Sequence, residues 1–178
     1  MRKFQSYELD RKTVEEFREQ AKAPIVIVLD NVRSALNVGS IFRTADALSC
    51  EAIYLCGITA SPPNKEIHKT ALGATESVSW QHFATSAQAV SQLMEQGYEV
   101  WAVEQAQGST FLPNFAPSPQ GKYAFIFGNE VHGVEQTLID QCGRCLEIPQ
   151  FGTKHSFNVA VSAGIVLWDA LSKWHYKT

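Results

Sequence analysis

The stretch IVIVLDNVRSALNVGSIFRTAD, residues 25–46, decides the fold class of this chain. Its first five residues form a continuous apolar run, which is typical of a strand buried on both faces. A polar turn and a helix-like segment at residues 40–48 follow, with Asn37 as the candidate helix cap and Gly39 permitting close backbone approach. Arg43 lies about one turn beyond Gly39. A strand that runs directly into a helix predicts an α/β protein.

The same alternation continues along the chain. Further apolar runs predict strands at residues 52–56, 99–103, 123–127 and 145–148, and helix-like segments lie at residues 86–96, 134–141 and 158–172. Strands that alternate with helices indicate a mostly parallel sheet with helices on both faces. In such sheets ligands bind at the carboxyl ends of the strands, so we expect the site in the loops that follow them.

Length and N-terminal composition predict one compact domain. The chain has 178 residues, of which 45% are hydrophobic, enough for one sizeable core. Residues 1–23 mix charges of both signs and are expected to form a solvated helical extension, with the domain at residues 24–178. No apolar run approaches the roughly 20 residues that span a bilayer, and the N-terminus is polar. We therefore expect a soluble, cytoplasmic protein without a membrane partner.

Charge and cysteine content limit the possible partners. The net charge is -3, so no global positive field indicates a nucleic-acid ligand, and any RNA contact must be local. Cys142 and Cys145 form a Cys-x-x-Cys, but a structural zinc site needs a second pair or nearby histidines. We predict four reduced structural thiols and no metal. A redox or metal role for this pair is the alternative.

Three loops after predicted strands carry most of the polar residues. Residues 30–46 and the rest of the chain contain neither a Gly-x-Gly-x-x-Gly turn nor a P-loop, which disfavours the ordinary dinucleotide and NTP sites. In residues 127–133 (FGNEVHG), Gly128 and Gly133 bracket a tight excursion of the kind that presses against a ligand. In residues 148–165, a loop leads through Ser156 into a helix of small residues. Each segment alone also fits an ordinary helix cap, turn or tight core packing.

Taken together and in this order, the three segments resemble the motifs of the SpoU/TrmH family of RNA ribose methyltransferases. The matching residues are Asn37-x-Gly39-x-x-x-Arg43-Thr44, then Phe127-Gly128-x-Glu130-x-x-Gly133, then Ile148-Pro149 running to Ser156-Phe157-Asn158-Val159. Residues 72–78 (LGATESV) resemble the middle region of the family, and the similarity covers residues 24–172. Two departures, Phe157 for the usual leucine and Ala160 for a common serine, lie beside the expected adenine pocket.

The resemblance implies a fold and an activity. The fold would contain a deep C-terminal trefoil knot, an exception to the usual rules of chain threading. The activity would be methyl transfer from S-adenosylmethionine to a ribose 2′-hydroxyl of structured RNA, with tRNA favoured because the chain carries no added domain. The same reaction on rRNA and a catalytically silent knotted RNA-binding dimer are the alternatives. A hydrolase built on His155 and Ser156 is disfavoured because no Gly-x-Ser-x-Gly elbow occurs.

The resemblance also implies site residues. The catalytic set is Asn37, Arg43, Glu130, Ser156 and Asn158, and main-chain contacts to the cofactor fall at Val103, Gly128, Ile148 and Phe157. We expect RNA contacts from Arg33, Lys65, His68, Lys69, Lys154 and His155, which would be salt-dependent. Arg43 would stabilise the developing alkoxide rather than act as a literal base, because arginine is too basic to deprotonate. A homodimer through the knot region, with site residues from both subunits, is also expected.

Overall fold

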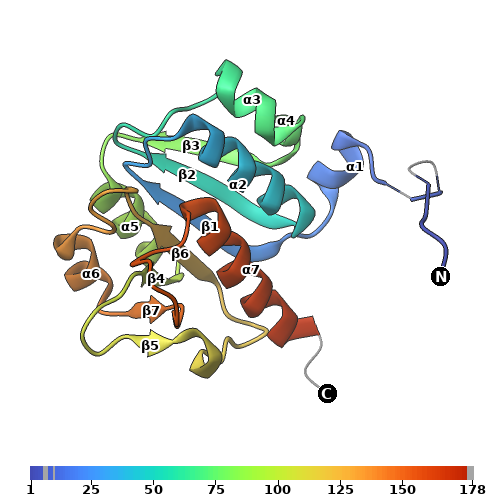
Figure 1. Cartoon of the computed structure of the whole chain (residues 1–178). Coiled ribbons are helices and arrows are strands. Elements are labelled where there is room, and N and C mark those ends of the chain that lie inside the picture. The colour runs from blue at the N-terminus through green and yellow to red at the C-terminus, as the bar shows by residue number, and fades with distance from the viewer. Residues whose placement is uncertain (6–7, 10, 176–178) are drawn as a thin grey trace.

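A single parallel sheet forms the centre of the molecule (Figure 1). The computed structural model describes residues 1–5, 8–9 and 11–175, and within them seven strands lie in the order β3-β2-β1-β6-β4-β7-β5. The strands are β1 (Ala23–Asp30), β2 (Cys50–Cys56), β3 (Ser79–Phe83), β4 (Glu99–Val103), β5 (Thr110–Phe111), β6 (Tyr123–Phe127) and β7 (Cys145–Glu147). The predicted α/β class with a parallel sheet is confirmed. The trefoil knot remains a prediction, because strand order does not define how the chain threads.

Helices cover both faces of the sheet. One face carries α2 (Ala35–Ala47), α3 (Lys65–Ala71), α4 (Ala74–Ser77) and α7 (Val159–His175), and the other carries α5 (Ser86–Glu95) and α6 (Gln136–Cys142). The side chains of β1 alternate between the two cores, with Ile27 in the first and Val26 and Val28 in the second. Successive side chains of a strand point to opposite faces, which explains why the apolar runs are continuous.

The start of α2 differs from the prediction. Ser34, not Asn37, is the N-cap, and its side chain accepts the Asn37 N–H at 3.3 Å, so the helix begins five residues earlier than expected. Asn37 thus lies in the first turn of the helix. The predicted close approach at Gly39 is confirmed, since a Cβ there would lie 2.3 Å from the Ile67 carbonyl oxygen. The neighbour at this position is α3, and not a ligand.

The N-terminal segment is only partly helical. Its helix α1 (Val14–Glu19) begins with a capping box formed by Thr13 and Glu16. Phe17 is buried in the core, and the Arg18 Nε donates to the Glu76 carbonyl oxygen at 2.8 Å. This part of the extension therefore docks against the domain and is not wholly solvated. The predicted extension and domain also include residues 6–7, 10 and 176–178, which lie outside the described residues.

Two further features concern membranes and thiols. None of the described helices is long and apolar enough to cross a bilayer. The four cysteines are outside any disulfide, and burial raises the pKa of the Cys50 and Cys56 thiols to about 12 and that of Cys142 to about 11. Thiols with raised pKa values stay protonated near neutral pH and are poor nucleophiles, which agrees with a structural role.

Candidate functional site

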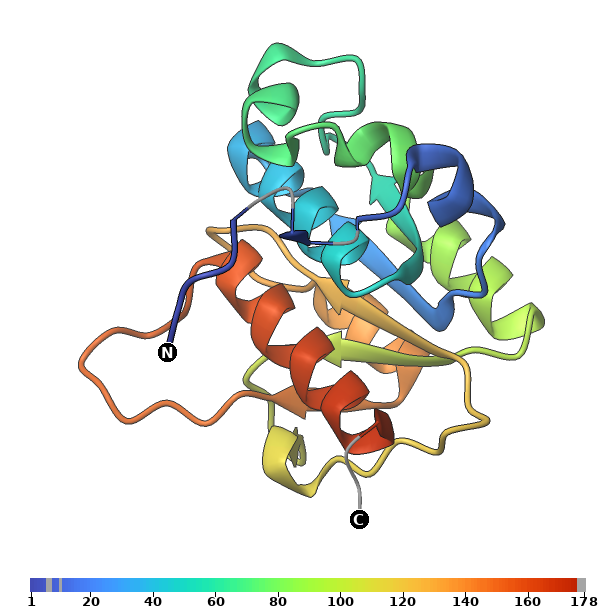
Figure 2. The ribbon, with the colours of Figure 1, turned by 90° about the vertical axis from the view of Figure 1, so that its right-hand side faces the viewer.

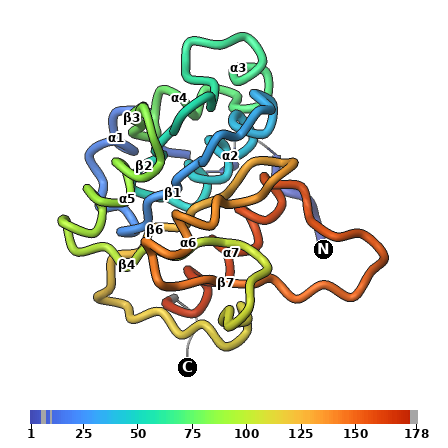
Figure 3. The backbone as a smooth tube through the Cα atoms, turned by 90° about the vertical axis from the view of Figure 1, so that its left-hand side faces the viewer, coloured from blue at the N-terminus to red at the C-terminus, as the bar shows by residue number. Residues whose placement is uncertain are grey.

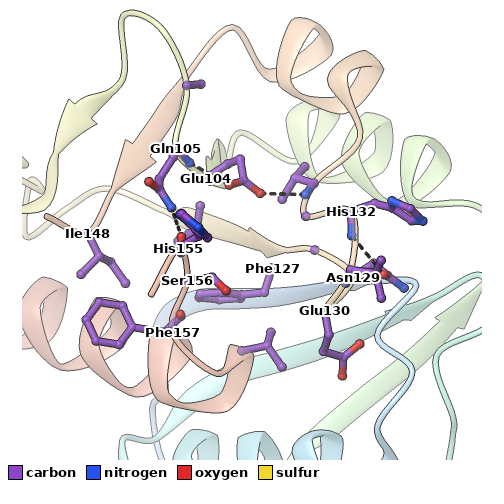
Figure 4. A pocket seen from close by; sticks show the side chains of 18 of the residues that line it. Glu104, Gln105, Phe127, Asn129, Glu130, His132, Ile148, His155, Ser156 and Phe157 are labelled. Atoms are coloured by element: carbon purple, nitrogen blue, oxygen red, sulfur yellow. Dashed lines mark hydrogen bonds between the residues drawn. The ribbon is translucent and has the colours of Figure 1, made fainter. Parts of the chain in front are cut away.

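A cleft of about 1000 Å³ opens at the carboxyl ends of β4, β6 and β7 (Figure 4). Its walls come from three segments that follow these strands, at residues 103–107, 127–136 and 148–159. This is the edge of the sheet at which α/β proteins bind ligands. The four predicted cofactor residues come from all three segments, and all of them line the cleft: Val103, Gly128, Ile148 and Phe157.

The second wall is a tight turn between two glycines. The main chains of Asn129 and Gly133 pair across it, with hydrogen bonds of 3.0 and 2.8 Å. A Cβ on Gly128 would lie 2.1 Å from the Gly133 carbonyl carbon, a separation that real Cβ atoms do not adopt. Gly133 has φ +69°, a conformation that glycine adopts without a steric penalty. The predicted tight excursion is therefore present, and both glycines are needed to form it.

The third wall is a long exposed loop between β7 and α7, which projects from the body of the molecule (Figures 2 and 3). His155 and Ser156 from this loop line the cleft. The Gln105 Nε2 donates to the His155 carbonyl oxygen at 2.6 Å and so joins the loop to the first wall. Asn158 begins α7 by accepting the Ala160 N–H at 3.0 Å. The helix cap is thus Asn158, which leaves the Ser156 hydroxyl beside the cleft.

A hydrogen-bond network brings the three sequence motifs together. The Glu130 carboxylate accepts the main-chain N–H groups of Arg33 and Ser34, at 3.0 and 3.1 Å, and the Asn37 Nδ2 at 3.1 Å. The Asn37 Oδ1 in turn accepts the Asn158 Nδ2 at 3.1 Å. Three of the five predicted catalytic residues therefore contact one another. They hold the start of α2, the 128–133 turn and the start of α7 in fixed relation.

Hydrogen bonding controls the charge state of Glu130. Partial burial acts to raise the pKa of its carboxyl group, but main-chain N–H groups, including those of Arg33 and Ser34, and the Asn37 amide lower it, and the net pKa lies below the usual value. Each donor favours the charged form over the neutral acid. Glu130 is therefore an anion at neutral pH and is poorly suited to act as a general base.

Other predicted residues lie away from the cleft. Arg43 is exposed on α2 and is not among the residues that line the cleft, and Lys65 and Lys69 are exposed on α3. Figure 1 shows α2 between α3 and α7. Lys154 lies on the exposed loop, and Arg33 lies just before α2. Of the predicted RNA-binding residues, His155 thus lines the cleft, Arg33 and Lys154 lie in the segments described above, and Lys65, His68 and Lys69 lie on α3. They do not form one compact patch.

The lining of the cleft is acidic. It contains Glu104, Glu130 and Glu135, and among the described residues that line it there is neither a lysine nor an arginine. Two of the residues in the first wall, Glu104 and Gln105, were not among the predicted site residues. The available signal was their position directly after the strand at residues 99–103, where a parallel sheet places its ligand-binding groups.

Comparison with known proteins identifies the family. The family model described as the SpoU rRNA Methylase family matches residues 24–168, which contain the sheet except its first residue, Ala23, together with the cleft and all three motifs. The chain belongs to this family. The resemblance inferred from Asn37, Gly128, Ser156 and their neighbours is confirmed.

Curated relatives share 30% identity with the chain over most of its length. The chain is 30% identical over 164 residues to the 23S rRNA (guanosine-2'-O-)-methyltransferase RlmB of Vibrio parahaemolyticus, which covers 92% of this chain and 65% of that protein. It is also 30% identical over 147 residues to RlmB of Neisseria meningitidis, covering 83% of this chain and 58% of that protein. The chain therefore spans about two thirds or less of the length of these relatives.

Solved structures of RNA-modifying enzymes share the fold. An AdoMet-bound rRNA methyltransferase from Sinorhizobium meliloti matches with a TM-score of 0.78 and 28% identity, covering 91% of this chain and 61% of that one. The TrmH/SpoU tRNA modifying enzyme of A. aeolicus matches with a TM-score of 0.79 and 22% identity, covering 90% of this chain and 80% of that one. The second match, at its lower identity, supports the fold alone.

Proposed function

We propose that this chain transfers a methyl group from S-adenosylmethionine to a ribose 2′-hydroxyl of RNA. The observation that carries the proposal is the convergence of Val103, Gly128, Ile148 and Phe157, from three separate segments, on one cleft. The family match covers all of these segments, and a solved relative of 28% identity is described as AdoMet-bound. The corresponding site in this chain is the cleft at the ends of β4, β6 and β7.

The residues present fit such a cofactor. Tight glycine turns and the exposed loop offer main-chain amide and carbonyl groups, which can hydrogen-bond an adenine and a ribose. Three carboxylates without a lysine or arginine in the described lining suit a ligand that carries a sulfonium cation. When bound, the cofactor supplies a methyl group that is already activated for transfer. Val103, Gly128, Ile148 and Phe157 would hold it mainly through main-chain atoms.

The remaining catalytic tasks are orientation and removal of a proton from a poorly acidic hydroxyl. The network of Glu130, Asn37 and Asn158 fixes the three loops that surround the reacting groups. Ser156, beside the cleft, would position the ribose. Arg43 would grip the adjoining phosphate with its planar fork and stabilise the developing alkoxide, and the hydroxyl proton would pass by way of that phosphate to solvent. Its guanidinium stays protonated, so an electrostatic role is the consistent one.

A second copy of the chain would complete the site. Arg43 lies outside the cleft of its own chain, on the helix that packs beside α7. On α7, Val161 is 50% exposed and Trp168 is 56% exposed, and a Cβ on the intervening Gly164 would meet open space. Residues spaced by three, four and seven share one helix face, so α7 presents an apolar face that a second α7 can cover. Such a homodimer would bring a second Arg43 towards each cleft.

Ribosomal RNA is the proposed substrate. The two curated relatives at 30% identity are named as 23S rRNA methyltransferases, whereas the tRNA modifying enzyme of A. aeolicus supports only the fold. The preference for tRNA drawn from the sequence therefore gives way to the rRNA alternative. An rRNA substrate also agrees with the cytoplasmic location expected from the sequence.

The decisive experiment supplies the purified chain with methyl-labelled S-adenosylmethionine and total RNA, then maps the labelled nucleotide. We expect label on one ribose of ribosomal RNA. Label on tRNA alone would instead identify tRNA as the substrate. No label, together with RNA binding, would instead identify a catalytically silent RNA-binding protein.

A further inference from the structure

Glu104 joins the first wall of the cleft to the second. It follows β4 directly, and its carboxylate accepts hydrogen bonds from two different segments (Figure 4). The Oε1 accepts the Gln105 N–H at 2.8 Å, and the Oε2 accepts the Val134 N–H at 3.0 Å. Val134 comes at the end of the glycine turn, so this carboxylate links the end of one strand to the turn that follows another.

The Glu104 carboxylate lies directly against Gly133. A Cβ on Gly133 would lie 2.0 Å from the Glu104 Oε2. The main-chain segment that bears Gly128, a predicted cofactor contact, is therefore held against the Glu104 side chain with no room for another atom between them. A carboxylate that accepts two N–H groups forms stronger hydrogen bonds than a neutral acceptor would.

We infer that Glu104 is a positioning residue for the cofactor, an inference that rests on the function proposed above. Its carboxylate fixes the 128–134 turn against the end of β4, and so sets the position of the turn's main-chain groups beside Val103. In glutamine, one oxygen is replaced by an NH2 group, which cannot accept either N–H. Glu104→Gln therefore keeps the shape of the side chain but leaves one main-chain donor without its partner.

The test compares the affinities of the full-length chain for S-adenosylmethionine and for its demethylated product, S-adenosylhomocysteine, by calorimetry. We expect Glu104→Gln to weaken both ligands by roughly tenfold or more, the effect of losing one hydrogen bond to a charged group. The KM for the cofactor should rise in proportion, while kcat at saturating cofactor stays close to that of the wild-type chain. A global folding defect would instead lower the apparent kcat and leave the KM for the cofactor unchanged.

Glu135→Gln is the matched control. It removes the same charge from the same cleft, and the structure gives the Glu135 carboxylate no hydrogen-bond donor among the described residues. Glu104→Gln should lose clearly more affinity for both ligands than Glu135→Gln does. The ratio of the affinities for S-adenosylmethionine and S-adenosylhomocysteine should change no more in Glu104→Gln than in Glu135→Gln. Glu104→Asp, which keeps both oxygens on a shorter side chain, should behave like Glu104→Gln.

Three outcomes decide the inference. Equal losses in the Glu104 and Glu135 variants, or wild-type affinity in Glu104→Gln, would overturn it. A loss that is more selective for S-adenosylmethionine in Glu104→Gln than in Glu135→Gln would also overturn it, because the Glu104 carboxylate would then act directly on the sulfonium. If the wild-type chain binds neither ligand, the proposed function fails, and this result is distinct from the three outcomes that overturn the inference. Unfolding temperatures measured without ligand confirm that each variant is folded.

Discussion

Gly128 leaves no room for an added side chain. A Cβ there would overlap the main chain of Gly133 and Val134, at 2.1 and 2.2 Å. Gly128→Val should therefore displace the turn and abolish binding of S-adenosylmethionine, as measured by calorimetry and by the absence of thermal protection. Gly152→Val is the control, because a Cβ on Gly152 meets no atom within 4 Å. Wild-type affinity in Gly128→Val would show that the cofactor does not use this turn.

Arg43 provides the sharpest test of the proposed chemistry. Arg43→Lys keeps the charge but loses the planar fork, so methyl transfer should fall by roughly two orders of magnitude. Cofactor affinity should barely change, because Arg43 lies outside the cleft. Single-turnover rates and cofactor titrations on the two proteins measure both quantities.

The alternative hypothesis is that Arg43 is an exposed helix residue without a role in catalysis. The same substitution would then change stability by no more than about 0.5 kcal/mol and leave turnover intact. A normal rate in Arg43→Lys, measured on the RNA that the wild-type chain methylates, would remove this residue from the mechanism.

At the scale of elements, the Glu130 network predicts a pH dependence of stability. The pKa of Glu130 is lower in the folded chain than its ordinary value of 4.5, so the ionised carboxylate stabilises the fold. This contribution is fully present above pH 4.5 and is lost as the pH falls through the lowered folded-state pKa. The difference in unfolding temperature between the wild-type chain and Glu130→Gln should therefore be constant near neutral pH and shrink in acid.

Glu95→Gln, on the exposed surface of α5, is the control for this measurement. It removes a carboxylate of the same type for which the structure gives no hydrogen bond among the described residues. Its unfolding temperature should follow the wild-type value across the same pH range. A Glu130→Gln difference that does not vary with pH would show that the carboxylate's charge does not support the network.

Buried strands were predictable from the sequence, whereas an exposed edge strand and two short helices were not. The predicted strands at residues 99–103 and 123–127 match β4 and β6, because buried apolar runs are legible from the sequence. β3 was missed because it is an edge strand with four of its five residues exposed, and α3 and α4 because each is short. The start of α2 was misplaced because Ser34 and Asn37 are both good caps, and Asn37 is used instead by Glu130 and Asn158.

In the candidate site, residues within the sequence motifs were predictable, whereas a residue that acts through a contact distant in sequence was not. Residues within the three motifs were predicted by their resemblance to a family, and those expected to contact the cofactor line one cleft. Glu104 was missed because its role depends on a contact with Val134, thirty positions further along the chain. No local pattern in a single sequence records such a contact.

At the scale of the whole molecule, the proposed homodimer predicts a mass. Sedimentation at micromolar concentration should give about twice the 19.7 kDa of one chain. Val161→Glu places a charge on the exposed apolar face of α7 and should yield monomers that lose methyl transfer but still bind the cofactor. Gln92→Glu on α5, on the opposite face of the sheet, should remain dimeric. A wild-type mass near one chain would refute the dimer.

The acidic lining of the cleft has a consequence for turnover. RNA is a polyanion, so on the proposed function the carboxylates of Glu104, Glu130 and Glu135 would repel its phosphates from the cofactor site. Arg33, Arg43 and Lys154 are exposed and are not among the residues that line the cleft, so they would remain accessible to phosphate. On the proposed function, methyl transfer also converts the sulfonium to a neutral thioether, so the acidic walls attract the product less strongly than they attract the cofactor. The weaker attraction would favour release of the product and binding of the next cofactor molecule.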